Sequence, residues 1–411
     1  MMTLGFLVVE LLADSSFCIA ATENAEAHDR PMALHPLDDS VIVPASSLIG
    51  SLRAHTATSA SVERADQLFG QIGEKNETKS SVVRALGVVV RLRDQPVGRL
   101  DLERRSQTAI DGRRGSAKTN SLRHSQTAPA GIVLRLYLEV RDADVLNEVG
   151  SLVASWCPTI GGGRSVGLGV ARVVSVNHGV LDLSTDEGLL AFLSYVGPEL
   201  VEHVARDTTP ITKHDLTPIR SWTFELTNPL LVRGEREGNN VHALLRNGKP
   251  VIDGSSWKGV FRHRAEHIVA SIARATGGAT DPEALDLLFG TLEHRGWLVF
   301  PDTTISGVVA DAPRPHVSID RVTGGARAER LFTDQPVETG SVRLSIWSST
   351  PVPDWVGVLL DTIVADIADG LVGIGGNTSR GYGSLTLAES ERPTSDVSAA
   401  VEHLLVGQGV H

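Results

Sequence analysis

One polar loop gathers the residue types that could do acid–base or metal chemistry. Residues 25–39, AEAHDRPMALHPLDD, contain His28, Asp29, His35, Asp38 and Asp39. Imidazoles and carboxylates can move protons or hold a divalent cation. Their spacing forms no catalytic triad, paired-carboxylate site or metal cluster, and an ordinary polar loop explains the same residues. The chemistry of this loop therefore depends on the elements around it.

A pair of serines opens a basic helix in the second half of the chain. In VIDGSSWKGVFRHR, residues 251–264, Ser255 and Ser256 precede apolar positions at helical spacing. The basic side chains on the following turns are Lys258, Arg262 and Arg264. Free N–H groups and the dipole at a helix start favour an anion, so the pattern predicts a phosphate site. Simple capping of the helix by the serines explains it equally well.

A glycine-rich loop is the second candidate for phosphate binding. Residues 373–383, GIGGNTSRGYG, would let the backbone approach a ligand, and Arg380 and Tyr382 offer a guanidinium fork and a stacking ring. The loop is predicted to follow a helix and precede a strand, which does not fit a Walker or dinucleotide fingerprint. A structural turn is the alternative.

Both motifs also occur in the first half of the chain, in the same order. VPASSLIGSLRAH, residues 43–55, aligns with residues 252–264 at an offset of 209, and GVVV at Gly87 aligns with GWLVF at Gly296 at the same offset. The segment IGGGRSVGLGVARV from Ile160 aligns with IGGNTSRGYGSLTL from Ile374 at an offset of 214, and LFG occurs in both halves. These ordered matches predict two tandem copies of one domain.

Each copy also carries an arginine-rich segment, at residues 110–131 and 319–340. Both segments begin with an aspartate, Asp111 or Asp320, and end with a glycine before an apolar strand. This pattern predicts two extended hairpins. A solvated loop is the usual explanation for such charge, but the equal length in both copies favours a functional arm.

Composition limits the function classes. The 411 residues, 41% of them hydrophobic, allow two to three packed domains. A net charge of -11 argues against a simple non-specific nucleic-acid binder, although residues 91–123 form a basic strip. Two cysteines make neither a disulfide framework nor a zinc site, which favours a cytoplasmic location. The apolar residues 1–20 lack a basic start and contain Glu10 and Asp14, so we expect a strand and no membrane span.

Each copy is predicted to run strand, long loop, helix, strand, arm, strand, helix, glycine loop, strand. The second copy has predicted strands at 220–232, 296–305 and 381–387, helices at 255–276 and 354–370, and a polar loop at 235–250. The βαββαβ order indicates an α+β fold of two tandem ferredoxin-like domains with inserted hairpins and glycine-rich loops. We place the domains at 1–205 and 221–390, with a linker at 206–220 and a C-terminal tail at 391–411 that contains a short helix.

The combination of P-x-SS-hydrophobic-x-G-x-x-R, LFG, the hydrophobic-Asp-Arg hairpin and the GG-x-x-S-x-G-x-G loop resembles the RAMP superfamily of CRISPR-associated proteins. More narrowly it is similar to the repeated backbone subunits of type III effector complexes, here as a tandem fusion like that of type III-D. The resemblance covers nearly the whole chain twice. It implies modified RNA-recognition folds that bind the CRISPR guide RNA through the serine-pair helix and the glycine loop. The hairpins would act as thumbs between guide and target RNA.

The resemblance assigns RNA-binding positions in both copies. In the first copy they are Ser46, Ser47, Arg53, Gly162, Gly163 and Arg164; in the second they are Ser255, Ser256, Lys258, Arg262, Gly375, Gly376, Ser379, Arg380 and Tyr382. The thumb positions are Asp111, Arg113, Arg114, Asp320, Arg321 and Arg327. Three departures from the family pattern are Ala45 for Gly, Asp253 for Pro, and Val166 at the place of Arg380.

Catalytic members of the family cut target RNA with an aspartate upstream of the serine pair. Counting back from Ala45 places this residue at Asp29, whereas the second copy has Asn240 there. The resemblance thus implies one cleavage site at Asp29, aided by Mg²⁺ or another divalent cation, and a non-cleaving second copy. Expected partners are guide RNA, target RNA and other effector subunits. A purely structural RNA scaffold, or a guide-maturation endoribonuclease using His28 or His35, is the alternative.

Overall fold

The structure is a computed structural model of the 411-residue chain. It describes residues 3–21, 29–72, 78–111, 116–212, 217–276, 282–291, 293–308, 313–388 and 391–393. The chain divides into two compact units. The first comprises Met1–Thr108, Thr119–Arg164 and Leu168–Asp215, and the second comprises Ala109–Lys118, Ser165–Gly167 and Leu216–His411. Within the described residues, no helix is long and apolar enough to cross a membrane.

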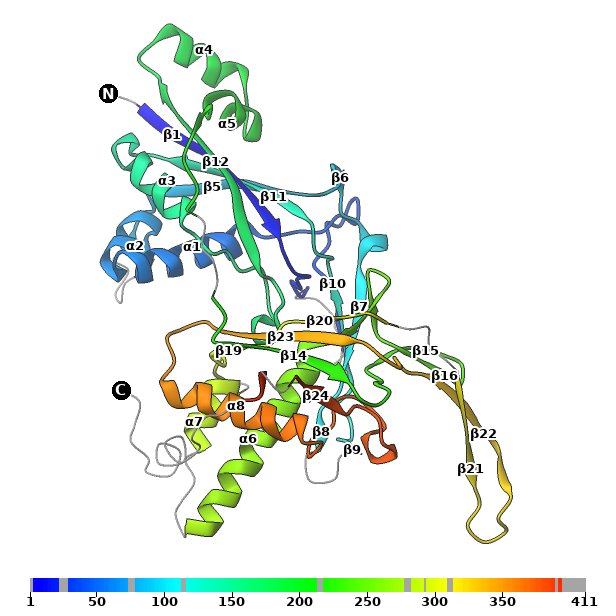
Figure 1. The fold of residues 1–411 in the computed structure, drawn as a ribbon. Coiled ribbons are helices and arrows are strands. Elements are labelled where there is room, and N and C mark those ends of the chain that lie inside the picture. Colours follow the sequence, from blue (N-terminus) through cyan, green and yellow to red (C-terminus); the bar gives the residue numbers. More distant parts are fainter. Residues whose placement is uncertain are drawn as a thin grey trace. The chain divides into compact units, whose positions relative to one another are not determined.

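The first unit is built on a six-stranded sheet with the order β13-β12-β1-β11-β5-β6 (Figure 1). The strands are β1 (Thr3–Ala13), β5 (Val83–Leu92), β6 (Gln95–Pro96), β11 (Val133–Val140), β12 (Ala171–Asp182) and β13 (Asp207–Thr208). The first strand, β1, lies antiparallel between β11 and β12, and β11 lies antiparallel to β5. The opening segment therefore forms a strand, as predicted, and this strand lies inside the sheet. β13 pairs with β12, so two residues of the predicted linker extend this sheet.

Both faces of this sheet are covered, because alternate residues of its strands point to opposite sides. Leu7, Val9 and Leu11 pack in the main core with helices α1 (Ala45–Ser59) and α3 (Leu146–Ala154). Phe6 and Tyr137 instead join a smaller core with α5 (Pro198–Val204). Further elements of this unit are α2 (Val62–Phe69), α4 (Asp186–Ser194), β2 (Asp29–Arg30), β3 (Gln71–Ile72), β4 (Thr78–Lys79), η1 (Arg99–Asp101) and η2 (Ala143–Val145). The 3-10 turn η3 (Arg164–Val166) begins in it.

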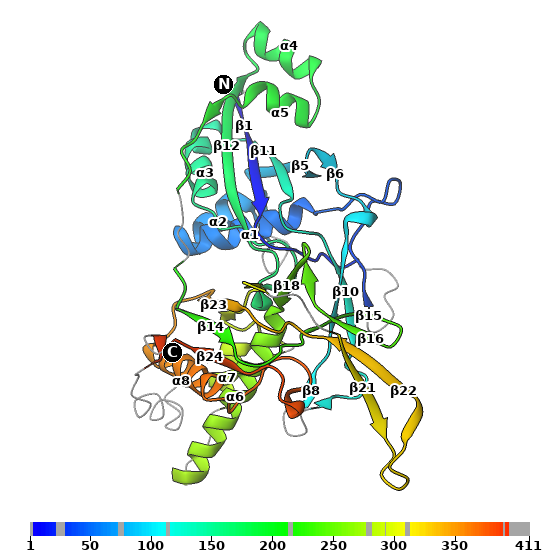
Figure 2. The same ribbon diagram turned by 45° about the vertical axis from the view of Figure 1, so that its right-hand side comes forward.

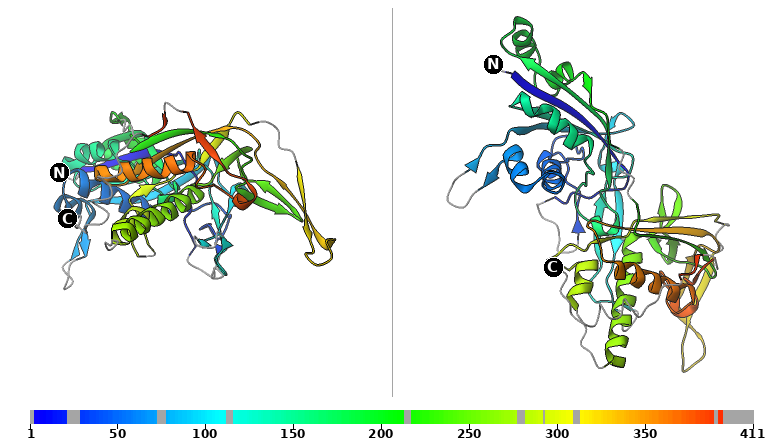
Figure 3. Two further views of the ribbon diagram at one scale, coloured as in Figure 1. Left: turned by 60° about the horizontal axis from the view of Figure 1, so that its bottom comes forward. Right: turned by 60° about the vertical axis from the view of Figure 1, so that its left-hand side comes forward.

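The second unit repeats the arrangement in a seven-stranded sheet, β17-β18-β20-β23-β14-β24 with β19 on β23. Its strands are β14 (Arg220–Leu226), β17 (Leu245–Arg246), β18 (Lys249–Ile252), β19 (Leu298–Val299), β20 (Thr303–Ser306), β23 (Ser341–Ser348) and β24 (Leu385–Leu387). Helices α6 (Gly254–Thr276) and α8 (Asp354–Ala368) lie side by side against the sheet, and α7 (Pro282–Phe289) contacts α6 (Figures 1 and 3). The predicted strand 296–305 is broken between β19 and β20, where Pro301 lacks an N–H to donate. The α+β fold class and its two repeats are confirmed.

Equivalent side chains fill equivalent places in the two cores. Leu48 and Leu52 of α1 are fully buried, as are Trp257 and Phe261 of α6, 209 residues later. The GVVV and GWLVF match is wrong, however. Val90 of β5 lies opposite Leu134 of β11, and Ile305 of β20 lies opposite Val342 of β23. If Leu134 is matched with Val342, then β5 corresponds to β20 at an offset of 215. The helix α6 has 23 residues and α1 has 15, so the two copies differ in length between the serine pair and this strand.

Both arginine-rich segments belong to hairpins, but each hairpin begins before the predicted bounds of 110–131 and 319–340, which leave out its first strand almost entirely. In the second unit β21 (Arg314–Ile319) and β22 (Ala326–Gln335) are antiparallel and extend away from the sheet (Figures 1 and 2). The first hairpin pairs β7 (Glu103–Gln107) with β10 (Arg123–Thr127), and β8 (Ile110–Asp111) pairs with β9 (Ser116–Ala117).

The expectation of a polar loop at 235–250 is wrong. This stretch contributes to four strands: β15 (Arg233–Glu237), β16 (Asn240–Ala243), β17 and β18. β16 pairs antiparallel with β15 and parallel with β22. These pairings provide hydrogen-bond partners for backbone N–H and C=O groups that the predicted loop would have exposed to water. Asn247 and Gly248 both have positive φ, 50° and 72°, the conformation that closes a two-residue hairpin between β17 and β18. The predicted C-terminal helix lies outside the described residues.

Candidate nucleic-acid interface

The two glycine loops have the same backbone geometry. The Ile160 N–H donates to the Gly169 carbonyl at 2.8 Å, and the Ile374 N–H donates to the Gly383 carbonyl at 2.9 Å. Gly169 and Gly383 have φ of 73° and 77°, and a Cβ on either would lie 2.0 Å from the isoleucine carbonyl oxygen. Only glycine fits at these two positions, so part of the glycine content is required by the loop itself.

Each loop is also held by the segment that follows the first strand of its unit. The Gly162 N–H donates to Cys18 O at 2.9 Å, and the Gly376 N–H donates to Leu231 O at 2.7 Å. Their remaining surroundings differ, because a Cβ on Gly162 would meet nothing within 4 Å, whereas one on Gly376 would lie 3.1 Å from Arg233 Nε. The first loop is therefore open at Gly162, while an arginine covers the second.

A buried carboxylate joins the second glycine loop to the base of its hairpin. Asp334 of β22 is 1% exposed and accepts hydrogen bonds from Asn377 Nδ2 at 2.8 Å and from the Tyr382 hydroxyl at 3.3 Å. His316 Nε2 lies 2.8 Å from Asp334 Oδ1, the oxygen that also accepts from Tyr382. Arg233 in turn donates to Asn377 Oδ1 at 3.3 Å. The loop and the hairpin therefore form one connected polar network.

This network gives Arg380 and Tyr382 opposite roles. Tyr382 is 6% exposed, and the Arg314 guanidinium lies over its ring at 5.5 Å, so the expectation that it offers a stacking face to a base is wrong. Arg380 is exposed, and its guanidinium carbon lies 5.7 Å from the centroid of the Phe332 ring. Among the described residues no carboxylate pairs with Arg380. Its charge, beside exposed Ser379, remains available to a phosphate.

The free amides expected at the start of α6 are bonded within the protein. The Gly254 N–H donates to Asp302 Oδ1 at 2.9 Å, and the Ser255 N–H donates to Asp253 Oδ1 at 2.7 Å. Two carboxylates therefore cap this helix and oppose an approaching anion. The mechanism that the sequence suggested for Ser255 and Ser256 is wrong on this point, and a contact of their hydroxyls with RNA stays a prediction.

The basic side chains of α6 also have internal partners. Lys258 donates to Ser165 Oγ at 2.9 Å, and burial, with a smaller effect of neighbouring Arg262, lowers the pKa of its ammonium. Arg264 donates to Asp366 at 2.7 Å. Arg262 donates to Asp286 at 2.8 Å and to the Gly290 carbonyl at 2.6 Å. In the first unit Arg53 pairs with Asp66 in the same way.

The serine pair of the first unit has a different environment. Ser46 and Ser47 are exposed, and the N-cap of α1, Pro44, accepts no hydrogen bond through its side chain. Arg164, which follows Gly163 in the glycine loop of the same unit, is half-buried, and this burial lowers the pKa of its guanidinium. Among the described residues, no carboxylate caps the start of α1, in contrast to the start of α6.

The hairpin tip of the second unit is a folded turn. Asp320 Oδ1 accepts from the N–H groups of Val322 and Thr323 at 3.0 Å each, and these bonds, that of Thr323 first, lower the pKa of the carboxyl group. Arg327 donates to the same side chain at 3.3 Å, while Arg321 is exposed. In the first hairpin Asp111 ends β8, and Arg113 and Arg114 lie outside the described residues.

Strand register places Asp29 and Asn240 at equivalent positions. β2 runs parallel to β10 with Asp29 opposite His124, and β16 runs parallel to β22 with Asn240 opposite Thr333, 209 residues after His124. The alignment made by counting along the sequence is therefore matched by the backbone pairing. The side chain of Asp29, and all of His28, lie outside the described residues.

His35, Asp38 and Asp39, the described acidic and histidine side chains of this loop, pair among themselves and with one arginine. His35 Nδ1 lies 3.2 Å from Asp38, whose carboxyl pKa is lowered chiefly by hydrogen bonds from Ser40. Asp39 pairs with Arg99 at 3.1 Å. Within the described part of the chain, no group of three His, Cys, Asp or Glu side chains could hold a metal ion.

The comparisons with known proteins identify the repeat. The model of the RAMP superfamily matches residues 19–172 and 223–386. The chain belongs to the RAMP superfamily, in two tandem copies. None of the curated proteins matches the chain.

Two solved structures of type III-B Cmr-beta contain chains similar to parts of this RAMP protein. For the cryo-EM structure of the apo state, the TM-score is 0.34 at 10% identity, over 41% of this chain and 96% of that chain. For the structure bound to cognate target RNA, the TM-score is 0.33 at 12% identity, over 43% of this chain and 61% of that chain.

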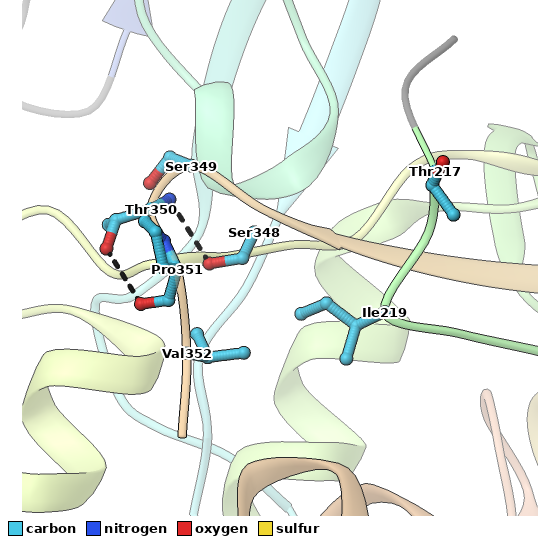
Figure 4. Close-up of a pocket in the computed structure, with 7 residues that line it drawn as sticks. All are labelled: Thr217, Ile219, Ser348, Ser349, Thr350, Pro351 and Val352. Carbon is cyan, nitrogen blue, oxygen red and sulfur yellow. Dashed lines mark hydrogen bonds between the residues drawn. The ribbon is translucent and has the colours of Figure 1, made fainter. Parts of the chain in front are cut away.

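Sequence reasoning missed Asp334, Asn377 and His316, which connect the glycine loop to the hairpin. No motif marks them, since they come from separate strands and from the loop. A shallow pocket at the end of β23, lined by Thr217, Ile219 and residues 348–352, has no charged side chain and includes none of the predicted site residues (Figure 4). The candidate interface is thus a surface of loop and hairpin residues.

Proposed function

We propose that this RAMP protein binds a CRISPR guide RNA as a double backbone subunit of a type III RNA-guided complex. In the proposal, the first unit cleaves bound target RNA at Asp29, and the second unit binds guide RNA without cutting. Membership of the superfamily and the exposed Arg380 and Ser379 beside the second hairpin support the binding role.

The single observation that carries the difference between the units is the register of the parallel strand pairs. Asp29 and Asn240 occupy the same place beside the second strand of their hairpins. The carboxylate of an aspartate can accept a proton or bind a cation through its negative charge. The amide of an asparagine is neutral and is not a base. The two copies therefore have the same scaffold with different chemical capacity.

RNA can be cut at such a site by its own 2′-hydroxyl. The 2′-oxygen loses its proton and attacks the adjacent phosphorus in line, the bond to the 5′-oxygen breaks, and this oxygen takes a proton from water, leaving a 2′,3′-cyclic phosphate and a 5′-hydroxyl. In this proposal Asp29 accepts the 2′-hydroxyl proton or orients the attacked phosphate, and the hairpin holds the nucleotide in line. A divalent cation bound by one carboxylate and the RNA phosphates would supply charge stabilisation.

The test uses the complex assembled with its guide, labelled matching RNA and Mg²⁺. We expect Asp29→Asn to abolish the cut while leaving target binding unchanged. The matched control is Asp39→Asn, because Asp39 lies in the same region but pairs with Arg99. Unchanged cutting at every position by Asp29→Asn would overturn the assignment and leave the scaffold alternative. Absence of guide RNA from the wild-type complex would overturn the proposed function, and cutting of free precursor by the lone protein would favour guide maturation.

A further inference from the structure

One helix of the first unit exposes nearly all of its large apolar side chains. In α4 the exposed fractions are 47% for Leu189, 66% for Leu190, 44% for Phe192 and 71% for Leu193. Val196, in the turn that follows, is 80% exposed. The helix lies outside α5 at one end of β12 (Figures 1 and 2). These five side chains, the α4 patch, lie within eight residues of chain, and such a concentration of exposed apolar side chains is typical of a surface that binds a partner.

The orientation of α4 is fixed by small residues on its inner face. Gly188 is buried, and a Cβ there would lie 2.0 Å from the Asp182 carbonyl oxygen, so only glycine allows this approach. Ala191 is the half-buried residue one turn later. Ordinary amphipathic helices bury their large residues and expose small or polar ones. In α4 the small residues face the protein and the large ones face outward.

The segment beyond α4 makes this orientation rigid. Leu200 and Val201 of α5 are buried in the small core with Phe6, and the Tyr195 and His203 rings stack at 4.3 Å across the turn. The exposed leucines therefore cannot turn inward without breaking packed contacts.

The charge of the residues around the α4 patch indicates which kind of molecule could bind there. Residues 182–205 contain five carboxylates and no lysine or arginine, although Glu202 pairs with Arg135 at 3.5 Å and Arg206 follows directly, so the uncompensated charge lies mainly at the α4 end of the segment. The carboxylates belong to Asp182, Asp186, Glu187, Glu199 and Glu202. An acidic rim repels nucleic acid and anionic lipid, and it also repels the same patch on a second copy of this chain. It is complementary to a protein surface that surrounds an apolar groove with basic side chains.

We propose that α4 is a docking helix that inserts the α4 patch into an apolar groove, rimmed by lysine or arginine, on a neighbouring protein subunit. This inference rests on the proposed function only in placing that partner within the same complex. The site is separate from the glycine loop and the hairpins, so protein docking and guide binding can be measured independently.

The test compares the assembled complex with one that carries Leu190→Gln and Leu193→Gln. Native mass spectrometry reads the subunit stoichiometry, and extraction of the bound RNA reads guide occupancy. We expect one protein subunit to be retained about tenfold less or worse, with guide occupancy unchanged, because two apolar side chains lose their burial. Leu100→Gln is the matched control, since Leu100 is fully exposed in η1 away from the patch.

A pair of charge variants gives the second arm. Asp186→Lys with Glu187→Lys should weaken retention of the same subunit, and Leu190→Met with Leu193→Met should preserve it. Full retention of every protein subunit by the glutamine variant overturns the docking proposal. Binding of RNA or of anionic vesicles by the wild-type patch, or self-association abolished by the glutamine variant, also overturns it. Loss of guide RNA from every form, wild type included, overturns the proposed function instead.

Discussion

Arg262 of α6 donates a 2.8 Å hydrogen bond to Asp286 of α7, and Arg53 of α1 pairs with Asp66 of α2 at the equivalent place in the first unit. Each aspartate stands two residues before the leucine of an LFG sequence. The arginine of the serine-pair motif and the LFG motif are thus two halves of one contact. This contact ties the serine-pair helix to the next helix in both units.

We therefore expect Arg262→Ala to lower the free energy of unfolding. We expect it to have little direct effect on the affinity for RNA. The substitution removes hydrogen bonds to Asp286, Glu266 and the Gly290 carbonyl, and we expect a loss of about 1 to 2 kcal/mol. Urea unfolding followed by circular dichroism measures it. Arg274→Ala, at an exposed position of the same helix, is the control and should change stability by less than about 0.5 kcal/mol. Loss of guide RNA without loss of stability would contradict this role.

The sequence alone shows where such motifs lie, but it does not show which groups their side chains contact. The repeat, the βαββαβ order and the hairpins follow from patterns along the chain, because strands and helices are encoded by local periodicity. The partner of Arg262 lies 24 residues away on another helix, and Asp302, which caps α6, lies 48 residues from the Gly254 amide. Whether a cation is free for phosphate depends on such distant carboxylates, and no spacing rule reveals them.

Arg380→Ala should weaken guide binding without loss of stability. Its guanidinium is exposed and lies over the Phe332 ring, so the substitution removes a charge but few packed atoms. Filter binding at several salt concentrations should show weaker binding and a log–log salt slope smaller by about 1, the amount expected for one lost phosphate contact. Arg274→Ala serves as the charge-matched control. Identical affinities and slopes for both variants would exclude a phosphate contact at Arg380.

Asp334→Asn should loosen the glycine loop and the hairpin together. The amide keeps the size of the carboxylate but turns N–H groups toward His316, Asn377 or Tyr382, and leaving a buried donor without an acceptor in this way costs about 1 to 3 kcal/mol. Hydrogen exchange should rise in residues 374–383 and in β21 and β22. Asp320→Asn, at the exposed hairpin tip, should leave exchange in the glycine loop unchanged. Equal exchange in wild type and Asp334→Asn would show that the network does not hold the loop.

The paired strands at 233–252 show why polarity misled the prediction of a loop. Their backbone groups pair with each other and with β22, so stability comes from sheet continuity and needs few apolar side chains. The Asn247-Gly248 turn was a readable local signal for a hairpin. The parallel pairing of β16 with β22 was not readable, because it joins residues more than ninety positions apart.

Tyr137 should make the first unit sensitive to alkaline pH. Burial, then the 2.7 Å hydrogen bond to Glu202, raises the pKa of its phenol to about 12. The unfolded chain releases this proton near pH 10 while the folded chain keeps it, so stability is retained below pH 10 and falls between pH 10 and 12, by up to about 2 to 3 kcal/mol. Tyr137→Phe should reduce this fall, with a cost near 1 kcal/mol at neutral pH from the lost hydrogen bond.

Thermal unfolding from pH 8 to 12 measures both effects. The control is Tyr195→Phe, which removes a phenol that is 36% exposed, and an equal reduction of the fall in this variant would show that the effect is not specific to Tyr137. A fall of the same size in Tyr137→Phe and wild type would show that other groups cause it.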